Sequence, residues 1–205
     1  HRDLHSFPTR RSSDLPRQVL VAGSTIYVVD TYNHRIQTFL SSGTYTGKWG
    51  SQGRGADQFS YPKGLVADNN GYLYVADTYN QRIKKMTTMG TSPTLWGGYS
   101  DDTGKFVTPR GIAKDSSGNL YVADTYNHRI QKMDSNGFFV AAYGSFGTNN
   151  RQFNAPSGVA IDAAGAIYVA DTANHRIQKL NSSGEYVTQW GSQGSNTGQF
   201  KSPLG

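Results

Sequence analysis

Residues whose types suit ion pairing, proton transfer or metal binding recur in this chain at a constant step of 47 positions. Each copy has an aspartate, followed three residues later by an asparagine and five residues later by an arginine. A carboxylate near a guanidinium can form a hydrogen-bonded ion pair, and an imidazole can transfer protons or bind zinc. The copies contain the aspartates Asp30, Asp77, Asp124 and Asp171, the asparagines Asn33, Asn80, Asn127 and Asn174, the arginines Arg35, Arg82, Arg129 and Arg176, and, directly before each arginine, His34, Gln81, His128 and His175.

The aspartate and the arginine of each copy admit a structural and a functional interpretation. Across a tight loop, the carboxylate can accept hydrogen bonds from loop amides and pair with the guanidinium, and the asparagine suits a turn. The alternative is a ring of arginines presented to phosphate. Because every copy has both partners, the sequence favours the structural role for the aspartates and asparagines, and the arginines stay candidates for ligand contact.

The histidines occupy one loop position in the first, third and fourth copies. Three imidazoles around a common axis could bind zinc and leave the fourth coordination position open, as catalytic sites do. The sequence has no cysteine, and it contains no nucleophile elbow, phosphate-binding loop or paired-carboxylate motif. We therefore expect no catalytic residue, no metal and no cofactor, and we place His34, Gln81, His128 and His175 among the residues that could contact a ligand.

Tyrosines precede the asparagine in three copies, at Tyr32, Tyr79 and Tyr126, and Ala173 replaces them in the fourth. An exposed tyrosine on a rigid scaffold is a good contact residue, because its ring is amphipathic and loses little rotamer entropy on binding. The alternative for these rings is packing against the neighbouring copy, and the sequence leaves both open.

The elements that position these residues are expected to be short strands. In the second copy, runs at residues 65–68, 72–76 and 82–86 and a last run ending at residue 97 are separated by turn residues, without helical periodicity. Four antiparallel strands per 47 residues, apolar on both faces, are typical of a β-propeller blade, whose faces are covered by neighbouring blades. A β-sandwich would not repeat so strictly. We expect an all-β propeller of about four four-stranded blades at residues 16–60, 61–107, 108–154 and 155–201, with a further repeat starting at 202–205.

The connections between the copies vary most in sequence. They lie at residues 51–58, 99–105, 145–152 and 192–199. On a propeller, these connections and the loops that carry the aspartates emerge on the same rim. Variable connections on a rigid scaffold predict that this rim is the binding face.

The repeat resembles the NHL repeat. It reads Pro-x-Gly-[Ile/Leu/Val]-Ala and then Asp-x-x-Gly-x-[Ile/Leu]-Tyr-Val-Ala-Asp-Thr-x-Asn-His-Arg-Ile-Gln, and the resemblance covers essentially all of residues 16–205. The Asn-His-Arg-Ile element lies at residues 33–36, 127–130 and 174–177, and residues 80–83 read Asn-Gln-Arg-Ile. NHL propellers usually have six blades, so the resemblance implies an open arc whose missing blades belong to the same parent chain.

The resemblance implies three candidate functions. The first, which we expect, is a non-enzymatic scaffold that binds a protein, peptide or glycan, as a sensor or adhesion module of a larger bacterial surface protein, outside the cell. RNA binding, as in some animal NHL domains, would place basic residues on phosphates and tyrosines on bases. A zinc-dependent lyase similar to peptidyl-α-hydroxyglycine amidating lyases would use the histidines, but its chemistry also needs a tyrosine and an arginine that the sequence does not place.

Residues 1–15 match no copy of the repeat and resemble the conceptual translation of a short-read sequencing adapter. We interpret them as a non-native segment from an unfinished metagenomic assembly and exclude them from the fold. The formal net charge of +6 comes from scattered residues, which permits contact with nucleic acid without favouring it. No apolar stretch approaches the length of a membrane-spanning helix.

Overall fold

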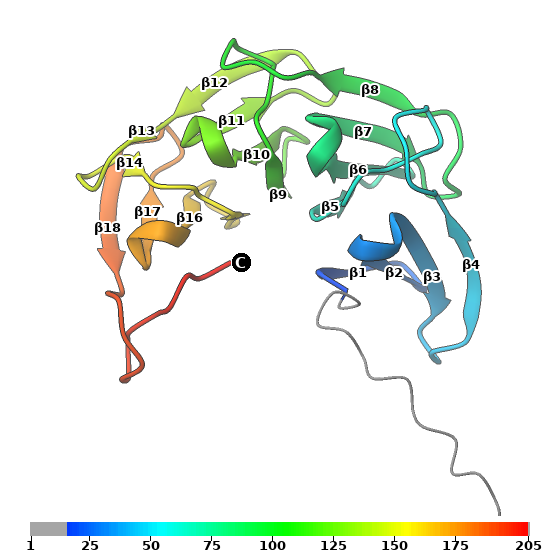
Figure 1. Cartoon of the computed structure of the whole chain (residues 1–205), viewed down its shortest axis with the longest axis horizontal. Coiled ribbons are helices and arrows are strands. Elements are labelled where there is room, and N and C mark those ends of the chain that lie inside the picture. Colours follow the sequence, from blue (N-terminus) through cyan, green and yellow to red (C-terminus); the bar gives the residue numbers. More distant parts are fainter. Residues whose placement is uncertain (1–15, 205) are drawn as a thin grey trace, which may run out of the picture.

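The computed structural model describes residues 16–204, and the adapter-like segment predicted at residues 1–15 lies outside them. The described residues form four four-stranded antiparallel sheets, in each of which the strands neighbour one another in chain order. Figure 1 shows these sheets side by side as the blades of an open arc, with the first strand of each blade at the concave edge. The predicted all-β propeller arc is therefore confirmed. No helix among the described residues is long and apolar enough to cross a membrane.

Each blade is a meander of four strands, with one turn of 3-10 helix between the second and third strands. The first blade comprises β1 (Gln18–Ala22), β2 (Thr25–Asp30), η2 (Thr31–Asn33), β3 (Arg35–Leu40) and β4 (Tyr45–Trp49). The second comprises β5 (Leu65–Ala67), β6 (Tyr72–Asp77), η3 (Thr78–Asn80), β7 (Arg82–Thr87) and β8 (Thr94–Gly97). The third comprises β9 (Pro109–Lys114), β10 (Leu120–Asp124), η4 (Thr125–Asn127), β11 (Arg129–Met133) and β12 (Phe139–Tyr143). The fourth comprises β15 (Gly158–Ile161), β16 (Ile167–Asp171), η5 (Thr172–Asn174), β17 (Arg176–Leu180) and β18 (Tyr186–Trp190).

The second strand of each blade is apolar on both faces, and the structure buries both. All five residues of β10 are buried, as are the last five residues of β6. Strands β8 and β18, at the outer edge of their blades, carry mostly exposed or half-buried residues. A small sheet with two apolar faces is stable only when both are covered, and here the adjacent blades cover them.

Three hydrophobic cores lie between neighbouring blades. Between the second and third blades, Tyr74 and Ile83 belong to the same cluster as Ile112 and Leu120. Equivalent clusters join the first blade to the second and the third to the fourth. Because a fully buried apolar side chain contributes about 1.5–3 kcal/mol, contact with the next blade stabilises each small sheet.

The outer strands of neighbouring blades are fitted together by a glycine. The Trp49 ring of β4 lies so close to Gly90, in the β7–β8 turn, that a Cβ there would be 2.5 Å from the ring. Gly90 also has a φ of +79°, a conformation in which side chains are strained. Trp96 with Gly137 and Tyr143 with Gly184 repeat this contact in the next blades. The contact explains why an aromatic residue and a turn glycine recur together at the 47-residue step.

The inner strands also approach closely. The Gly111 amide of β9 donates a hydrogen bond to the Ser157 carbonyl at 2.8 Å, and a Cβ on Gly111 would lie 2.6 Å from that oxygen. In the first copy Gln18 takes the position of this glycine, because the preceding Arg17 pairs with Val29 as Lys63 does with Ala76. There the side-chain amide of Gln18 both donates to the Leu65 carbonyl and accepts from the Leu65 amide, at 2.7 Å each. A side chain thus supplies the contact that backbone makes elsewhere.

The connections between blades contain short parallel pairs. Between the third and fourth blades, β13 (Ser145–Phe146) pairs in parallel with β14 (Gln152–Phe153). Single parallel bridges occupy the same place elsewhere, as between Tyr99 and Phe106. The phenylalanine in each pair is fully buried at Phe59, Phe106 and Phe153. The parallel pairing and the buried phenylalanine therefore fix each connection to the blades that it joins.

Candidate functional site

The loop that carries the recurring polar residues is a tight turn with one geometry in all four blades. After Asp77, residues Thr78–Asn80 form one turn of 3-10 helix, and Gln81 closes it in the left-handed conformation with a φ of 58°. His34, His128 and His175 close the other three turns with φ values of 54–56°. Figure 1 shows the four helical turns repeated along the arc. The turns place Tyr79 and its equivalents on the rim.

Each aspartate is the centre of a hydrogen-bond network. Asp124 is fully buried, and its Oδ2 accepts from Asn127 Nδ2 at 2.9 Å, Arg129 Nε at 2.8 Å and Gln131 Nε2 at 3.0 Å. Its Oδ1 accepts from the Val107 amide, which precedes the blade, at 2.7 Å. Asp171 makes the same four bonds, and Asp77 makes the three that do not involve a glutamine. Asp30 accepts from Asn33, Arg35 and Gln37. For Asp124, the four donors favour the charged form of the carboxylate, but burial has the larger effect and raises its pKa.

In the second, third and fourth blades the arginine ties the turn to the connection that precedes the blade. The Arg82 Nε pairs with Asp77 Oδ2 at 2.7 Å, and its terminal nitrogens donate to the carbonyls of Arg54, Gly55 and Gln58 at 2.9–3.1 Å. The side chains of Arg35, Arg82, Arg129 and Arg176 are 9–28% exposed. Three of the arginines proposed from the sequence as ligand contacts therefore have most of their donors engaged inside the protein, whereas Arg35 donates to Asp30 alone among the described residues.

One position of this network differs between the copies. Gln131 Nε2 donates to the carbonyl of Lys105, and Gln178 does the same to Gln152. In the second blade the residue is Lys84, whose Nζ donates to the Gln58 carbonyl at 2.5 Å and lies 3.8 Å from the Phe59 ring centre. Lys84 is fully buried, and burial lowers its pKa to about 8.

The histidines link one blade to the next. The Nδ1 atoms of His34, His128 and His175 accept hydrogen bonds at 3.0 Å from the backbone amides of Tyr61, Ala155 and Ser202, all 27 residues further on. Gln81 Oε1 accepts from the Thr108 amide in the same way. An Nδ1 that accepts requires a neutral ring with its proton on Nε2. Burial accordingly lowers the pKa of His34 and of His128.

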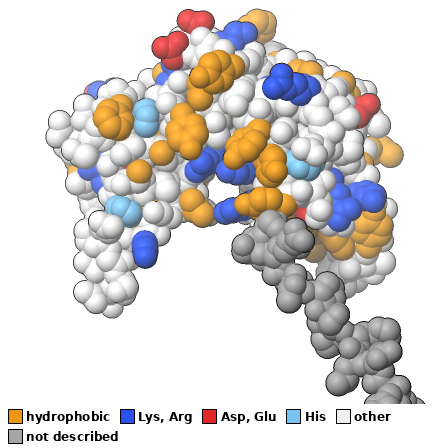
Figure 2. Space-filling view, in the orientation of Figure 1, with side chains coloured by type: hydrophobic (Ala, Val, Ile, Leu, Met, Phe, Trp, Pro, Cys, Tyr) orange, Lys and Arg blue, Asp and Glu red, His pale blue; other side chains and the backbone are white. Residues whose placement is uncertain are grey.

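The three histidines are not gathered at one point. They are the pale blue side chains of Figure 2 and lie well apart on the face that the figure shows. Among residues 16–204, no group of three His, Asp or Glu side chains has a geometry that could hold a metal ion.

The tyrosines divide between packing and exposure. Tyr32 is half-buried and lies edge-on to Tyr61, with ring centres 5.6 Å apart. Tyr79 and Tyr126 are 52% and 55% exposed. The structure adds Tyr99 at 77% and Phe146 at 65%, which sequence reasoning did not single out. The available signal was an aromatic residue where the other copies have Gln52 and Gln193. We refer to Tyr79, Tyr99, Tyr126 and Phe146 as the rim aromatic residues.

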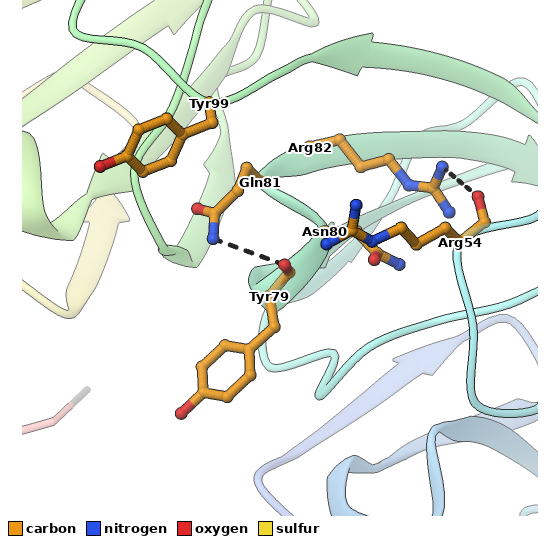
Figure 3. Close-up of a pocket in the computed structure, with 6 residues that line it drawn as sticks. All are labelled: Arg54, Tyr79, Asn80, Gln81, Arg82 and Tyr99. Carbon is orange, nitrogen blue, oxygen red and sulfur yellow. Dashed lines mark hydrogen bonds between the residues drawn. The ribbon is translucent and has the colours of Figure 1, made fainter.

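Two of the rim aromatic residues border a hollow of about 230 Å³. Figure 3 shows Tyr79 and Tyr99 on opposite sides of Gln81, with Arg54, Asn80 and Arg82 beside them. Asn80 and Arg82 donate to carbonyls of residues 53–58 and hold the wall of the hollow. Arg54 is exposed, so its side chain is available to a ligand.

The turns and their connections carry the family signature. Three segments, residues 59–86, 106–133 and 153–180, match the NHL repeat. Each match begins at the buried phenylalanine of a connection and ends in the third strand of a blade. The chain belongs to the NHL-repeat β-propeller family. No curated protein sequence matches the chain.

Solved structures of similar fold include enzymes and a protein complex. Virginiamycin B lyase from Staphylococcus aureus superposes with a TM-score of 0.66 at 16% identity, over 85% of this chain and 55% of the lyase. The nidogen/laminin complex gives 0.65 at 18% identity, over 85% of this chain and 62% of the matched one. Kuenenia stuttgartiensis hydrazine synthase gives 0.65 at 14% identity, over 91% and 51%. At these identities the likeness concerns the fold alone, and the chain spans little more than half the length of the matched chains.

Proposed function

We propose that this propeller is a non-enzymatic scaffold that binds a protein, peptide or glycan through its rim. The observation that supports this most is the exposure of the rim aromatic residues, which ranges from 52% to 77%. Aromatic rings offer a large contact area with few rotatable bonds, so binding orders them at low entropic cost. They stand on turns and connections that the aspartate networks hold rigid.

The hollow between Tyr79 and Tyr99 is the proposed centre of this surface. Two phenol rings supply apolar contact, and the exposed Arg54 guanidinium on one side of them supplies hydrogen-bond donors (Figure 3). Ligand sites combine apolar contact area with a few fixed polar groups, and this hollow has both. A peptide side chain or a sugar ring fits this combination.

The polar residues of the turns already form hydrogen bonds and ion pairs within the protein, and this supports a non-enzymatic role. The aspartates accept up to four internal hydrogen bonds, and the arginines pair with them at 2.6–2.8 Å. The histidines use Nδ1 to join blades, so Nε2 carries the proton and is a donor. A zinc lyase would need these imidazoles as free acceptors that converge on one ion.

The biological setting is part of the proposal. A propeller of similar fold occurs in the nidogen/laminin complex, and that likeness makes a protein partner one of the ligand classes to test. Because the chain spans about half of such propellers, we propose that it is one part of a larger bacterial surface protein, in which it acts as a sensor or adhesion module.

The test is selection of ligands on the purified chain from a peptide library and a glycan array, followed by titration against variants. Tyr79→Ala introduces the residue that the fourth copy has at this position, Ala173, and Tyr99→Gln introduces that of the first and fourth copies. Both substitutions are therefore compatible with the blade. We expect each to weaken binding of a selected ligand at least tenfold.

The matched control is Tyr45→Ala, which removes an exposed tyrosine from the outer strand β4. It should leave the affinity unchanged. A ligand that binds the tyrosine variants and the wild type equally well would contradict a rim site, and stoichiometric zinc that disappears in His128→Ala would favour the lyase alternative.

A further inference from the structure

A second hollow, of about 640 Å³, lies at the concave centre of the arc. The starts of the innermost strands of all four blades line it, and three of the lining residues are basic: Arg17, Lys63 and Arg110. Lys63 and Arg110 occupy equivalent positions in the second and third copies. Arg17 holds the same position in the first, since its amide donates to the Val29 carbonyl as that of Lys63 does to Ala76. Figure 2 shows Lys and Arg side chains gathered at this concave edge.

The positive charge at this hollow is not neutralised within residues 16–204. Every salt bridge of the described chain belongs to the turn arginines or to Lys132, and none involves Arg17, Lys63 or Arg110. Burial, and after it the charges of Arg110 and Arg17, together lower the pKa of Lys63 to about 8. Like charges that lie close together without a counterion repel each other, and a bound anion would offset this repulsion.

Arg110 also has an unsatisfied donor. Its Nε is the one buried side-chain nitrogen or oxygen of the described residues that lacks a hydrogen-bond partner. The Nε atoms of the four turn arginines each donate to an aspartate. A buried donor without an acceptor destabilises the folded state, and in native proteins such groups often await a ligand, ion or water.

Aromatic rings border the basic residues on the side of the rim. The Arg110 guanidinium lies 5.8 Å from the centre of the Tyr126 ring, and the Lys63 ammonium lies 6.0 Å from that of Tyr79. These cation–π contacts orient both side chains. They place two of the rim aromatic residues next to the basic groups, although neither ring lines the hollow.

We propose that this hollow binds a tetrahedral oxyanion group, a phosphate or sulfate, through Arg17, Lys63 and Arg110. A guanidinium presents its donors in a planar fork that suits two oxygens of such a group, and an ammonium adds a compact charge. The site is separate from the hollow between Tyr79 and Tyr99. It stands or falls independently of the rim function.

The direct test is calorimetric titration of the full chain with inorganic phosphate and with sulfate at low ionic strength. Lys63→Ser and Arg110→Ser introduce the residue that the fourth copy has at this position, Ser157, and they should fold at least as stably as the wild type. Lys48→Ser removes an exposed charge on β4 and is the matched control. We expect phosphate to bind the wild type and Lys48→Ser alike, and to bind Lys63→Ser and Arg110→Ser at least tenfold more weakly.

A second readout distinguishes a site at Lys63 from general attraction to a basic protein. Phosphate should draw a proton onto Lys63 at pH 8–9, so the measured heat should depend on the ionisation enthalpy of the buffer. That dependence should be absent in Lys63→Ser. Equal affinity in all four proteins, or no binding of either anion, would overturn the proposal.

A third ligand, phenyl phosphate, tests whether the anionic group belongs to a larger molecule or is a free ion. Phenyl phosphate that binds more tightly than inorganic phosphate, and loses that advantage in Tyr126→Ala, would support the site and show that a larger ligand carries the group. Equal binding of the two would support a free anion. Binding of an oligouridylate alone, with a steep dependence on salt, would overturn the proposal in favour of an extended nucleic-acid surface.

Discussion

Lys84 shows how one residue changes the energetics of a repeated site. In three blades a glutamine completes the aspartate network, whereas the second blade buries an ammonium against Phe59 without a salt bridge to any described carboxylate. A buried charge without a paired partner is unfavourable, and its pKa falls as a result. The 47-residue repeat shows that lysine replaces glutamine here. Its burial was not predictable from the sequence, because it depends on how the connection around Gln58 folds over the side chain.

Replacing Lys84 with glutamine is therefore expected to stabilise the protein. The side-chain amide can donate to the Gln58 carbonyl as Gln131 and Gln178 do to theirs. At pH 7 the gain in the free energy of unfolding is expected to reach about 3 kcal/mol, the equivalent of the pKa depression. Urea unfolding of Lys84→Gln beside the exposed control Lys48→Gln measures it.

The pH dependence gives an independent check. The pKa of Lys84 is about 8 in the folded chain and about 10.4 when unfolded. Between these values the unfolded chain binds a proton that the folded chain does not, so the contribution of Lys84 to stability rises with pH over this window. The difference between wild type and Lys84→Gln should shrink from pH 8 to pH 10.5; a constant difference would contradict the assignment.

At the scale of elements, blades are joined by contacts that join residues far apart in the chain. The histidine bonds span 27 residues, and the aromatic–glycine contacts join the outer strand of one blade to a turn of the next. The histidine bonds each connect two residues of positive φ, as His34 and Tyr61 are. Because adjacent blades share a core, loosening one such bond weakens two sheets together.

The histidine bonds should make blade docking sensitive to acid. Burial lowers the pKa of His34 and His128, so near pH 6.5 and below the unfolded chain binds protons that the folded chain resists. Stability should therefore fall as pH decreases through 6.5. The double variant His34→Gln/His128→Gln copies Gln81, which accepts from the next blade without titrating. Thermal unfolding between pH 5 and 8 should show a smaller slope for the variant, and an equal slope would contradict the role given to the imidazoles.

The strands were predictable from the sequence because turn residues and apolar runs are local signals. Strands β5, β6 and β7 lie within one residue of the runs expected at 65–68, 72–76 and 82–86. The contacts of the loops were less accessible. That an imidazole accepts from an amide 27 residues away, or that Arg110 is left with a buried free donor, follows from the curvature of the arc. Tyr99 and Phe146 could have been predicted as site residues only by comparing the copies with one another.

At the scale of the whole molecule, the arc separates two kinds of residue. Polar side chains of the turns face inward and bind the connections, whereas the rim aromatic residues and the basic residues at the concave centre face outward or into the central hollow. The end blade also exposes apolar side chains, with Val19 and Val21 of β1 at 59% and 65%. The central claim is that the recurring aspartate set holds the fold and that recognition belongs to the exposed rim.

The most direct test of this claim is the free energy of unfolding of Asp124→Ala compared with Tyr126→Ala. Removing the carboxylate leaves the Val107 amide, Asn127 and Arg129 without their acceptor, so we expect a loss of about 1–3 kcal/mol. Tyr126→Ala copies Ala173 and should stay within about 0.5 kcal/mol of the wild type. Unchanged stability in Asp124→Ala would contradict the structural role of the aspartates and make them candidates for catalysis again.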